Sequence, residues 1–498
     1  MKNIKFLLPI IIIGTLSWGC DETGGGGGFT PSGSIIAVAE RAGGNQAIKV
    51  GGTEGSVPPG SLVDVKNLNT RETQSTIGLA DGSFDPPFMG NTNDIFNVLV
   101  TNQGSIFDDV TIGVTLLRDF VFRNLAQLGS FPDVIEILDN RAYVINGGSN
   151  NIQIFDLNQN PPNQVGMIVL PPNSNPTAMA FVDSERAYVS NNIGQSVALV
   201  NIVTTECEVL IVRAGQGGPT APCNEVLTVA GIPFEDPSGI AIANGKVYVA
   251  NGNFAVTPDF TVEPLGPGFV SIINAQTNQF IGTINTTGTL SSGLKVVNNN
   301  LYVVNSGTIA SDFSTCNFDF PPSVDIIDTS TDTLTDTIDI ALSQQNPTVC
   351  LPESIVTTSD NNFIYLGLGL VGALFKLDIV NNTVINGPSD PLVITDLNGL
   401  NFTAGLAVRD NLLFISLFNS DQIAVLNTDD DQVNPFPYAF PFPAGLRSDN
   451  PDSNFFDGVQ SIAIRPGTAG IDFTGPDLYF ITGLSSQLGS IDTTLGIQ

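Results

Sequence analysis

No histidine occurs anywhere in the 498-residue chain. This absence excludes Ser-His-Asp and Cys-His catalysis, and it excludes zinc, copper or haem sites held by histidine. The cysteines show no CxxC spacing, so a four-cysteine zinc site is not expected. The sequence also lacks a P-loop and a dinucleotide fingerprint. Any catalytic chemistry would therefore fall to Asp, Glu, Asn or Lys side chains.

Basic residues are scarce as well. The chain has 17 Lys and Arg against 48 Asp and Glu, which gives a formal net charge of −31. Such a surface repels nucleic acid and anionic lipid headgroups and tolerates cations. We therefore expect no nucleic-acid partner. Because only 13% of the residues are charged, much of the polar surface is expected to be Asn, Ser and Thr.

The first residues indicate export. Lys2 and Lys5 precede a short apolar run, and Gly19 stands before Cys20. This pattern resembles a bacterial lipoprotein signal, which implies that residues 1–19 are removed and that Cys20 is acylated. Ser17 and Trp18 differ from the residues usual in that signal, so an ordinary signal peptide with a chance cysteine is the alternative. The Gly-rich residues 20–33 predict a flexible tether that holds a folded domain away from a membrane.

The remaining four cysteines form two pairs that are close in sequence. These pairs are Cys207 with Cys223 and Cys316 with Cys350. Export to an oxidising compartment favours disulfides, and four free buried thiols are the alternative.

From residue 114 to 498 the chain repeats itself seven times. Each repeat has an aromatic residue in an apolar strand, and six of the seven tyrosines of the chain stand at this position. A second strand ending in Asp or Asn closes 13 residues later in five repeats and 26 residues later in two. The aromatic positions are Tyr143, Tyr188, Tyr248, Tyr302, Tyr365, Phe414 and Tyr479. Repeats of this length, built from four short strands separated by turns, predict a seven-bladed β-propeller.

The segments YVIN, YVSN, YVAN and YVVN at the first four aromatic positions resemble the YVTN-type β-propeller repeat family. The motif degenerates in the last three repeats. The seventh repeat ends soon after its third strand, so we expect residues 114–125 to supply its fourth strand and close the ring. The aromatic residues are expected to form the core between blades.

Residues 34–113 do not repeat. Short strands between turns such as Pro58-Pro59-Gly60 and Asp81-Gly82 predict a small β-sandwich. The segments GSVPPGSLVDVKN and LADGSF resemble immunoglobulin-like and carboxypeptidase-regulatory-like modules, which implies a spacer. The expected fold class is therefore all-β, a seven-bladed β-propeller preceded by a small β-sandwich.

Two long insertions, 253–267 and 306–322, lie between the second and third strands of adjacent repeats. In a propeller these loops share a face, and long loops on a rigid scaffold often carry binding sites. Five phenylalanines would form a ridge there, or would pack under their own loops. They are Phe254, Phe260, Phe313, Phe318 and Phe320.

Carboxylates offer a weaker prediction. Oxygen ligands at near-alternating positions could gather around Ca²⁺, although the full EF-hand pattern is missing; these residues are Asp449, Asp452, Asn454 and Asp457. The run Asp429–Asp431 is interpreted as a solvated hairpin turn rather than a Ca²⁺ site. No other cofactor is indicated.

Two functions from different classes remain open. The first is a non-catalytic surface lipoprotein that presents the propeller for protein or glycan binding at the cell envelope, at the outer membrane or cell surface rather than the inner membrane. The alternative is a lactonase-like hydrolase that uses a carboxylate-bound divalent cation in the propeller channel. The missing histidine and the degenerate, loop-rich repeats favour the first.

Overall fold

The computed structural model describes most of the chain after residue 34. The described residues are 35–39, 46–52, 56–80, 82–84, 86–91, 94–116, 128–159, 162–216, 218, 220–257, 262–310, 315–395, 401–420, 422–433, 440–441, 458–467, 476–484 and 486–491. Their regular elements are all β-strands, which confirms the all-β prediction. Nowhere among these residues does a helix have the length and apolar character needed to cross a membrane.

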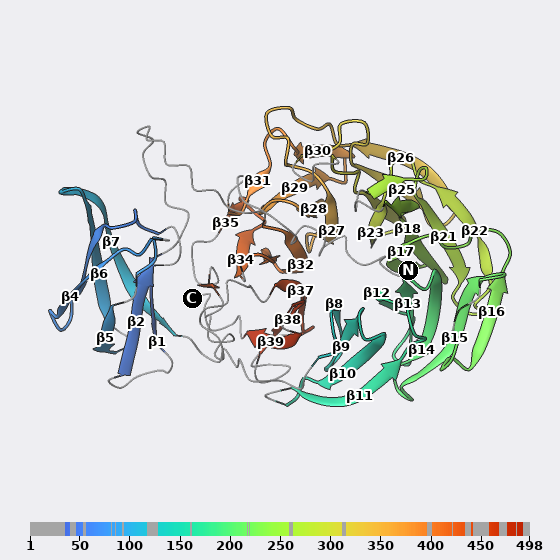
Figure 1. The fold of residues 1–498 in the computed structure, drawn as a ribbon, viewed down its shortest axis with the longest axis horizontal. Coiled ribbons are helices and arrows are strands. Elements are labelled where there is room, and N and C mark those ends of the chain that lie inside the picture. Colours follow the sequence, from blue (N-terminus) through green and yellow to red (C-terminus); the bar gives the residue numbers. More distant parts are fainter. Residues whose placement is uncertain are drawn as a thin grey trace.

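The N-terminal domain is a folded seven-stranded sheet, drawn in blue in Figure 1. Its strands are β1 (Ile35–Ala39), β2 (Gln46–Gly52), β3 (Leu62–Asn67), β4 (Thr73–Ile77), β5 (Pro87–Gly90), β6 (Ile95–Asn102) and β7 (Ser105–Leu116). They follow the order β4-β3-β6-β7-β1-β2-β5. The long strand β7 pairs antiparallel with β6 and then, through its last three residues, parallel with β1. It therefore belongs to both halves of the sheet.

The two halves pack face to face around one apolar core. Val65 and Phe96 from one half and Val50 and Phe88 from the other are almost fully buried in the same cluster. The rings of Phe88 and Phe96 meet edge to face with their centroids 5.1 Å apart. A sheet that covers its own apolar face in this way is a β-sandwich, as the turn-rich sequence predicts.

Seven further sheets form the blades of a propeller. Blade 1 contains β8 (Pro132–Leu138), β9 (Arg141–Asn146), β10 (Asn151–Asp156) and β11 (Asn163–Val169); blade 2 contains β12 (Pro176–Phe181), β13 (Arg186–Asn191), β14 (Ser196–Asn201), β15 (Glu206–Arg213) and β16 (Glu225–Val229); blade 3 contains β17 (Pro237–Ala243), β18 (Lys246–Asn251), β21 (Phe269–Asn274) and β22 (Phe280–Asn285). Blade 4 contains β23 (Ser291–Val297), β24 (Asn300–Asn305), β25 (Ser323–Asp328) and β26 (Thr333–Asp339); blade 5 contains β27 (Pro352–Thr357), β28 (Phe363–Leu368), β29 (Ala373–Asp378), β30 (Thr383–Asn386) and β31 (Leu392–Val393). Blade 6 contains β32 (Thr403–Arg409), β33 (Leu412–Leu417), β34 (Gln422–Asn427), β35 (Gln432–Val433) and β36 (Phe440–Pro441); blade 7 contains β37 (Val459–Ile464), β38 (Leu478–Thr482) and β39 (Gln487–Ile491).

The first strand of every blade lines a central channel. These inner strands contact one another in the order β8, β12, β17, β23, β27, β32 and β37, and β37 in turn contacts β8. The ring is therefore closed, and Figure 1 shows the blades arranged radially around it. The seven-bladed prediction is confirmed.

Closure of the ring involves blade 7 and blade 1 directly. Arg465, which follows β37, is 1% exposed and donates to the Leu157 carbonyl at 3.0 Å and to the Asn158 side chain at 2.6 Å. The Leu128 amide, just before β8, donates to the Ser486 carbonyl beside β39. Val114–Leu116, the start of the segment predicted to complete blade 7, pair instead with β1 in the N-terminal domain. The prediction is therefore wrong for residues 114–116, because β7 continues past the predicted boundary at residue 113. The rest of the predicted segment, residues 117–125, lies outside the described residues.

The aromatic residue of each repeat lies on the second strand and is at most 2% exposed. Three of the tyrosine hydroxyls hydrogen-bond to the outer hairpin turn of the next blade: Tyr188 to Asn278, Tyr248 to Asp332 at 2.7 Å, and Tyr365 to Asp431. Each of these turn residues has a positive φ of 56° to 58°. The predicted inter-blade core is therefore found, and the tyrosines also act as polar links.

Asp431 was predicted to lie in a solvated hairpin turn, but its side chain contacts the neighbouring blade. Its carboxylate also accepts from Lys376 Nζ of blade 5 at 2.6 Å. The equivalent carboxylate of Asp332 accepts from Lys246 Nζ at 2.7 Å. The turn carboxylates at these two positions thus join neighbouring blades.

Candidate functional site

The first strand of each blade begins with the same irregularity. In all seven blades its first residue pairs with the last residue of the second strand. Immediately afterwards the register slips by one residue in all seven blades. A β-bulge of this kind redirects the side chain of the extra residue. The residues that follow the first position of the seven inner strands are Asp133, Thr177, Ser238, Ser292, Glu353, Ala404 and Gln460, and we call them the mouth ring.

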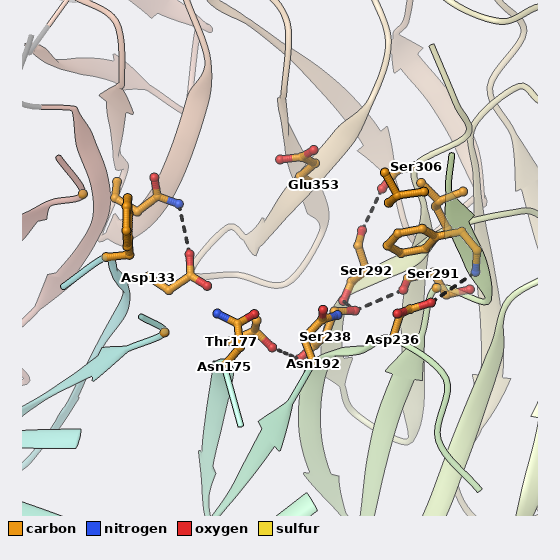
Figure 2. Close-up of a pocket in the computed structure, with 18 of the residues that line it drawn as sticks. Asp133, Asn175, Thr177, Asn192, Asp236, Ser238, Ser291, Ser292, Ser306 and Glu353 are labelled. Atoms are coloured by element: carbon orange, nitrogen blue, oxygen red, sulfur yellow. Dashed lines mark hydrogen bonds between the residues drawn. The ribbon is translucent and has the colours of Figure 1, made fainter. Parts of the chain in front are cut away.

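A cavity of about 260 Å³ lies at this end of the channel. Every member of the mouth ring except Ala404 lines it. Phe131, Phe254 and Phe418 add aromatic surface, and Asn175, Asn192 and Asp236 add polar groups. Figure 2 shows the labelled side chains, among them Asp133, Ser238 and Glu353, arriving from several blades around one space. The cavity is therefore built from the part of each blade that the bulges have in common.

Most hydroxyl groups around the cavity hold the inner strands together. Ser238 Oγ donates to the Ser291 carbonyl of the next blade at 3.1 Å, and Ser306 Oγ donates to the Pro352 carbonyl at 2.7 Å. Thr177 Oγ1 reaches the Pro237 carbonyl at 3.4 Å. The strands also approach closely, since a Cβ at Gly239 would lie 2.1 Å from the Ser292 carbonyl oxygen. These groups position the rim of the cavity and have little hydrogen-bonding capacity left for a ligand.

Two carboxyl groups of the mouth ring face the cavity. Burial raises the pKa of Asp133 to about 7, although a 3.3 Å hydrogen bond from Gln460 Nε2 partly opposes this. Burial, together with the charge of Asp133, raises the pKa of Glu353 to about 7. Glu353 makes no side-chain hydrogen bond or ion pair with the residues that the structure describes. Figure 2 shows both carboxyl groups directed toward the same space.

A second charged layer follows along the channel. Glu136 lies three residues beyond Asp133 on β8, and Lys295 lies three residues beyond Ser292 on β23. Burial raises the pKa of Glu136 to about 7, and the positive charge of Lys295 counteracts part of that rise. Opposite charges therefore face each other below the mouth ring, whereas the residues lining the cavity include no Lys or Arg.

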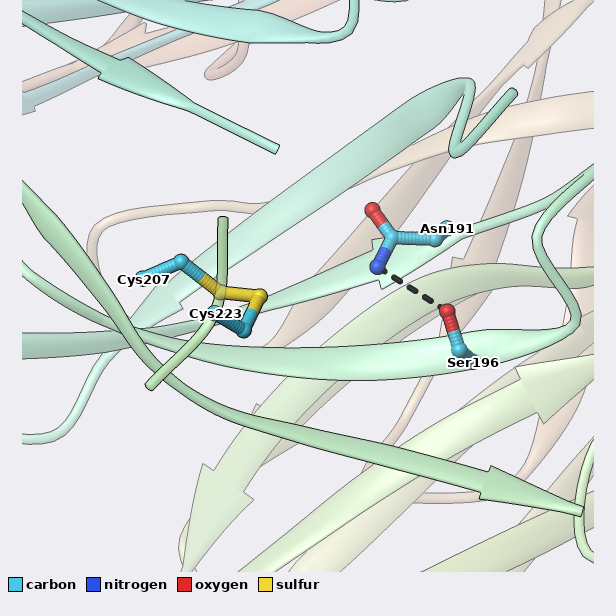
Figure 3. Close-up of a disulfide and its surroundings, with 4 residues drawn as sticks. All are labelled: Asn191, Ser196, Cys207 and Cys223. Atoms are coloured by element: carbon cyan, nitrogen blue, oxygen red, sulfur yellow. Dashed lines mark hydrogen bonds between the residues drawn. A yellow bond between two sulfur atoms is a disulfide. The ribbon is translucent and has the colours of Figure 1, made fainter. Parts of the chain in front are cut away.

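Both predicted disulfides are present. Cys207–Cys223, with a Cα–Cα distance of 4.5 Å, links β15 to the loop before β16, and β16 then pairs in parallel with β15 (Figure 3). Cys316–Cys350, with a Cα–Cα distance of 6.0 Å, joins the second insertion to the residue two before β27. The second insertion, which belongs to blade 4, therefore lies beside the start of blade 5, as the repeat pattern predicts.

The predicted phenylalanine ridge is only partly described. The first insertion folds into its own hairpin, β19 (Phe254–Val256) with β20 (Val262–Pro264), and Phe254 lines the cavity. Phe318 and Phe320 are 39% and 37% exposed and do not line it. Phe260 and Phe313 lie outside the described residues.

Other predicted site residues also fall outside the described ranges. They are Cys20, the proposed lipidation site, and the possible Ca²⁺ ligands Asp449, Asp452, Asn454 and Asp457. Among the residues that the structure does describe, no three His, Cys, Asp or Glu side chains gather closely enough to hold a metal ion.

Sequence reasoning missed Asp133 and Glu353. A signal for them exists, because both follow a proline that opens an inner strand, as do Thr177 and Ser238. Aligning the seven repeats on that position would have shown a ring containing two carboxyl groups.

Known structures share the propeller fold. Hydrazine synthase of Kuenenia stuttgartiensis superposes with a TM-score of 0.51 at 14% identity, covering 75% of this chain and 98% of that one. Virginiamycin B lyase from Staphylococcus aureus gives 0.48 at 11% identity, over 74% and 97% of the two chains. The WD40 domain of Neurospora crassa Pan2 gives 0.45 at 13% identity, over 73% and 88%. No protein-family model and no curated protein matches the sequence. Similarity at this level shows the fold alone.

Proposed function

We propose that this chain is an exported lipoprotein of the cell envelope that presents its propeller as a non-catalytic binding module. The ligand, carried by a protein or a glycan, enters the channel-mouth cavity. The YVTN-type repeats and the immunoglobulin-like spacer suggested by the sequence belong to the same proposal. Its anchor is a lipid on Cys20, and the Gly-rich residues 20–33 are the tether.

The observation that carries this proposal is that the bulges at the start of the inner strands lie at the cavity and supply its lining residues. Six of the seven bulges bring a side chain to the wall of this cavity, and cross-blade hydrogen bonds fix several of the inner strands that carry them. A rigid concave site with aromatic walls and a few convergent polar groups is the usual form of a ligand pocket. The hairpin β19–β20 extends the wall of this pocket through Phe254.

One observation favours the alternative of a hydrolase. Asp133 and Glu353 both have a pKa near 7, and a carboxyl group with such a pKa is suited to general acid or base catalysis. A divalent cation would depend on the same two residues, since they are the only carboxyl groups of the mouth ring. The experiment below therefore includes this activity.

The test uses the chain from residue 21 onward as bait against the envelope fraction of the source organism. Asn192→Trp places a large ring at the cavity rim, whereas Thr331→Trp places the same ring on an exposed turn at the opposite face and is the matched control. We expect the control to capture a partner that Asn192→Trp does not. Equal capture by both variants contradicts a site at the cavity. Hydrolysis of lactones in the presence of divalent cations, lost in Glu353→Gln, would instead support the hydrolase.

The membrane anchor is tested separately. A bacterial host expressing the full chain is fed an alkyne-tagged fatty acid, and the protein is examined for the label. We expect labelling of the natural chain and none of Cys20→Ala. An unlabelled natural chain that is still exported would mean that the ordinary signal peptide is the better interpretation.

A further inference from the structure

We propose that the channel-mouth cavity binds a cationic group of the ligand, an ammonium or a guanidinium, between Asp133 and Glu353. This inference rests on the proposed function, because it names the chemistry of the group that enters the same cavity. It follows from the cavity at the channel mouth, from the Glu353 carboxyl group, which has no side-chain partner among the described residues, and from the distribution of charge around both.

Among the residues that the structure describes, the charged side chains that line the cavity are all acidic. They are Asp133, Asp236 and Glu353, and no described Lys or Arg joins them. Asp236 is already compensated, since its carboxylate accepts from Gln195 Nε2 at 3.1 Å and from the Phe254 amide at 3.3 Å. Asp133 accepts one hydrogen bond from Gln460. Two carboxyl groups thus remain with unused capacity toward the cavity.

Glu353 is the more informative of the two. Its side chain is half-buried, faces the cavity, and has no side-chain hydrogen bond or ion pair within the described part of the chain. A carboxylate that is partly removed from water is costly unless a cation or a hydrogen-bond donor joins it. Because the described residues supply neither, we infer that the ligand does.

The second charged layer explains why a cation would stay at the mouth. Lys295 stands beyond the mouth ring, and its charge acts on Glu136. A cationic ligand is therefore attracted by Asp133 and Glu353 and is repelled by Lys295 if it moves further in. Phe254 and Phe418, which also line the cavity, provide aromatic surface of the kind that accommodates organic cations.

The size of the cavity limits what can enter. A volume of about 260 Å³ corresponds to roughly nine water molecules at ~30 Å³ each. The end of a lysine or arginine side chain fits such a space, and so does a small free amine. Two carboxyl groups do not supply the six to eight oxygen ligands that Ca²⁺ takes. An organic cation is therefore favoured over a metal ion.

The first measurement is calorimetric binding of Nα-acetyl-arginine amide, Nα-acetyl-lysine amide and the neutral isostere Nα-acetyl-citrulline amide. The protein is the disulfide-intact chain from residue 21 onward at about pH 8, where both carboxyl groups are ionised. We expect the two cations to bind and citrulline to bind at least about tenfold more weakly. Binding of citrulline as tight as arginine, or no binding of either cation, overturns the inference.

Variants locate the interaction. Glu353→Gln and Asp133→Asn are each expected to weaken arginine binding about tenfold and to remove most of its pH dependence. Asp410→Asn, in a turn at the opposite end of β32, makes the same charge change and should leave binding unaltered. In the natural chain, binding should weaken at about pH 5.5, because both carboxyl groups are then protonated.

Failure of this inference is distinguishable from failure of the proposed function. A partner that is lost with Asn192→Trp but still binds Glu353→Gln and Asp133→Asn with unchanged affinity means that the cavity binds without the charge. The source of the cation follows from competition. Displacement of the captured partner by arginine amide assigns the cation to a basic side chain of that partner, whereas binding of arginine amide that displaces nothing assigns it to a small free amine.

Discussion

Replacing the buried Arg465 by methionine should destabilise the propeller more than the same replacement of the exposed Arg186. The guanidinium group is buried between blade 7 and blade 1, where it donates to the Leu157 carbonyl and to the side chains of Asn140 and Asn158. Asn140 and Asn158 are exposed, so their side chains can hydrogen-bond to water when Arg465 is replaced. Leu157 is 2% exposed, so its carbonyl would remain without a donor. An unsatisfied buried acceptor together with the lost charged hydrogen bonds costs about 3 kcal/mol.

The assay is urea unfolding followed by tyrosine fluorescence. All seven tyrosines lie between residues 143 and 479, and the only tryptophan is Trp18 in the signal, so the fluorescence of the chain from residue 21 onward reports on the propeller and not on the N-terminal domain. Arg186→Met is the matched control, because Arg186 forms an exposed ion pair with Asp183 whose loss costs at most about 1 kcal/mol. If Arg465→Met lowers the unfolding midpoint no more than Arg186→Met does, Arg465 does not hold the ring closed.

Three further predictions follow from the structure. Tyr365→Phe removes the hydroxyl that donates to Asp431 of the next blade and should lower the free energy of unfolding by about 1 kcal/mol. A double-mutant cycle with Asp431→Asn should show that the two effects are coupled. Additive effects would contradict a link between the blades through this hydrogen bond. Replacing both Cys316 and Cys350 by serine should lower the free energy of unfolding by about 0.7 kcal/mol more than the same change at Cys207 and Cys223, because a disulfide that closes a 34-residue loop restricts the unfolded chain more than one that closes a 16-residue loop. The midpoints of urea unfolding of the two variants measure this difference. The reverse order of the two midpoints would refute the chain-entropy account. The pKa values of Asp133 and Glu353 rise from 3.8 and 4.5 to about 7 on folding, so the folded state binds more protons than the unfolded state, and the free energy of unfolding should fall as the pH rises from about 4 to about 7. Glu353→Gln should make this pH dependence shallower. An unchanged pH dependence would mean that folding does not raise the pKa of Glu353.

The number of blades and the arrangement within each blade could be predicted from the sequence. The tyrosines recur at a fixed distance from a closing Asp or Asn, and that spacing requires a hairpin in which the second and third strands are antiparallel. In blade 1 the structure pairs Tyr143 with Ile154 in such a hairpin. The disulfide pairs were also predictable, because Cys207 and Cys223 are close in sequence and because the repeat brings Cys316 and Cys350 to the same side of neighbouring blades. These features are local or periodic, so a single chain displays them.

The N-terminal domain shows where local signals are insufficient. The predicted boundary of this domain at residue 113 falls inside β7, which continues to Leu116. Its last residues form a strand by pairing with β1, more than seventy positions earlier in the chain, and no local pattern marks such a pairing.

The candidate site was decided by the tertiary structure. Asp133 and Glu353 are 220 positions apart, and each alone has the sequence context of an ordinary surface carboxylate after a proline. Only the closed ring brings blade 1 and blade 5 to one cavity, and only burial there raises the pKa of both groups. The sequence by itself determined the period of the repeat, the hairpins and the cysteine pairing, because these depend on neighbours along the chain. The tertiary structure decided which side chains meet across the channel, because that depends on the bulge of every inner strand and on the contacts that close the seventh blade onto the first.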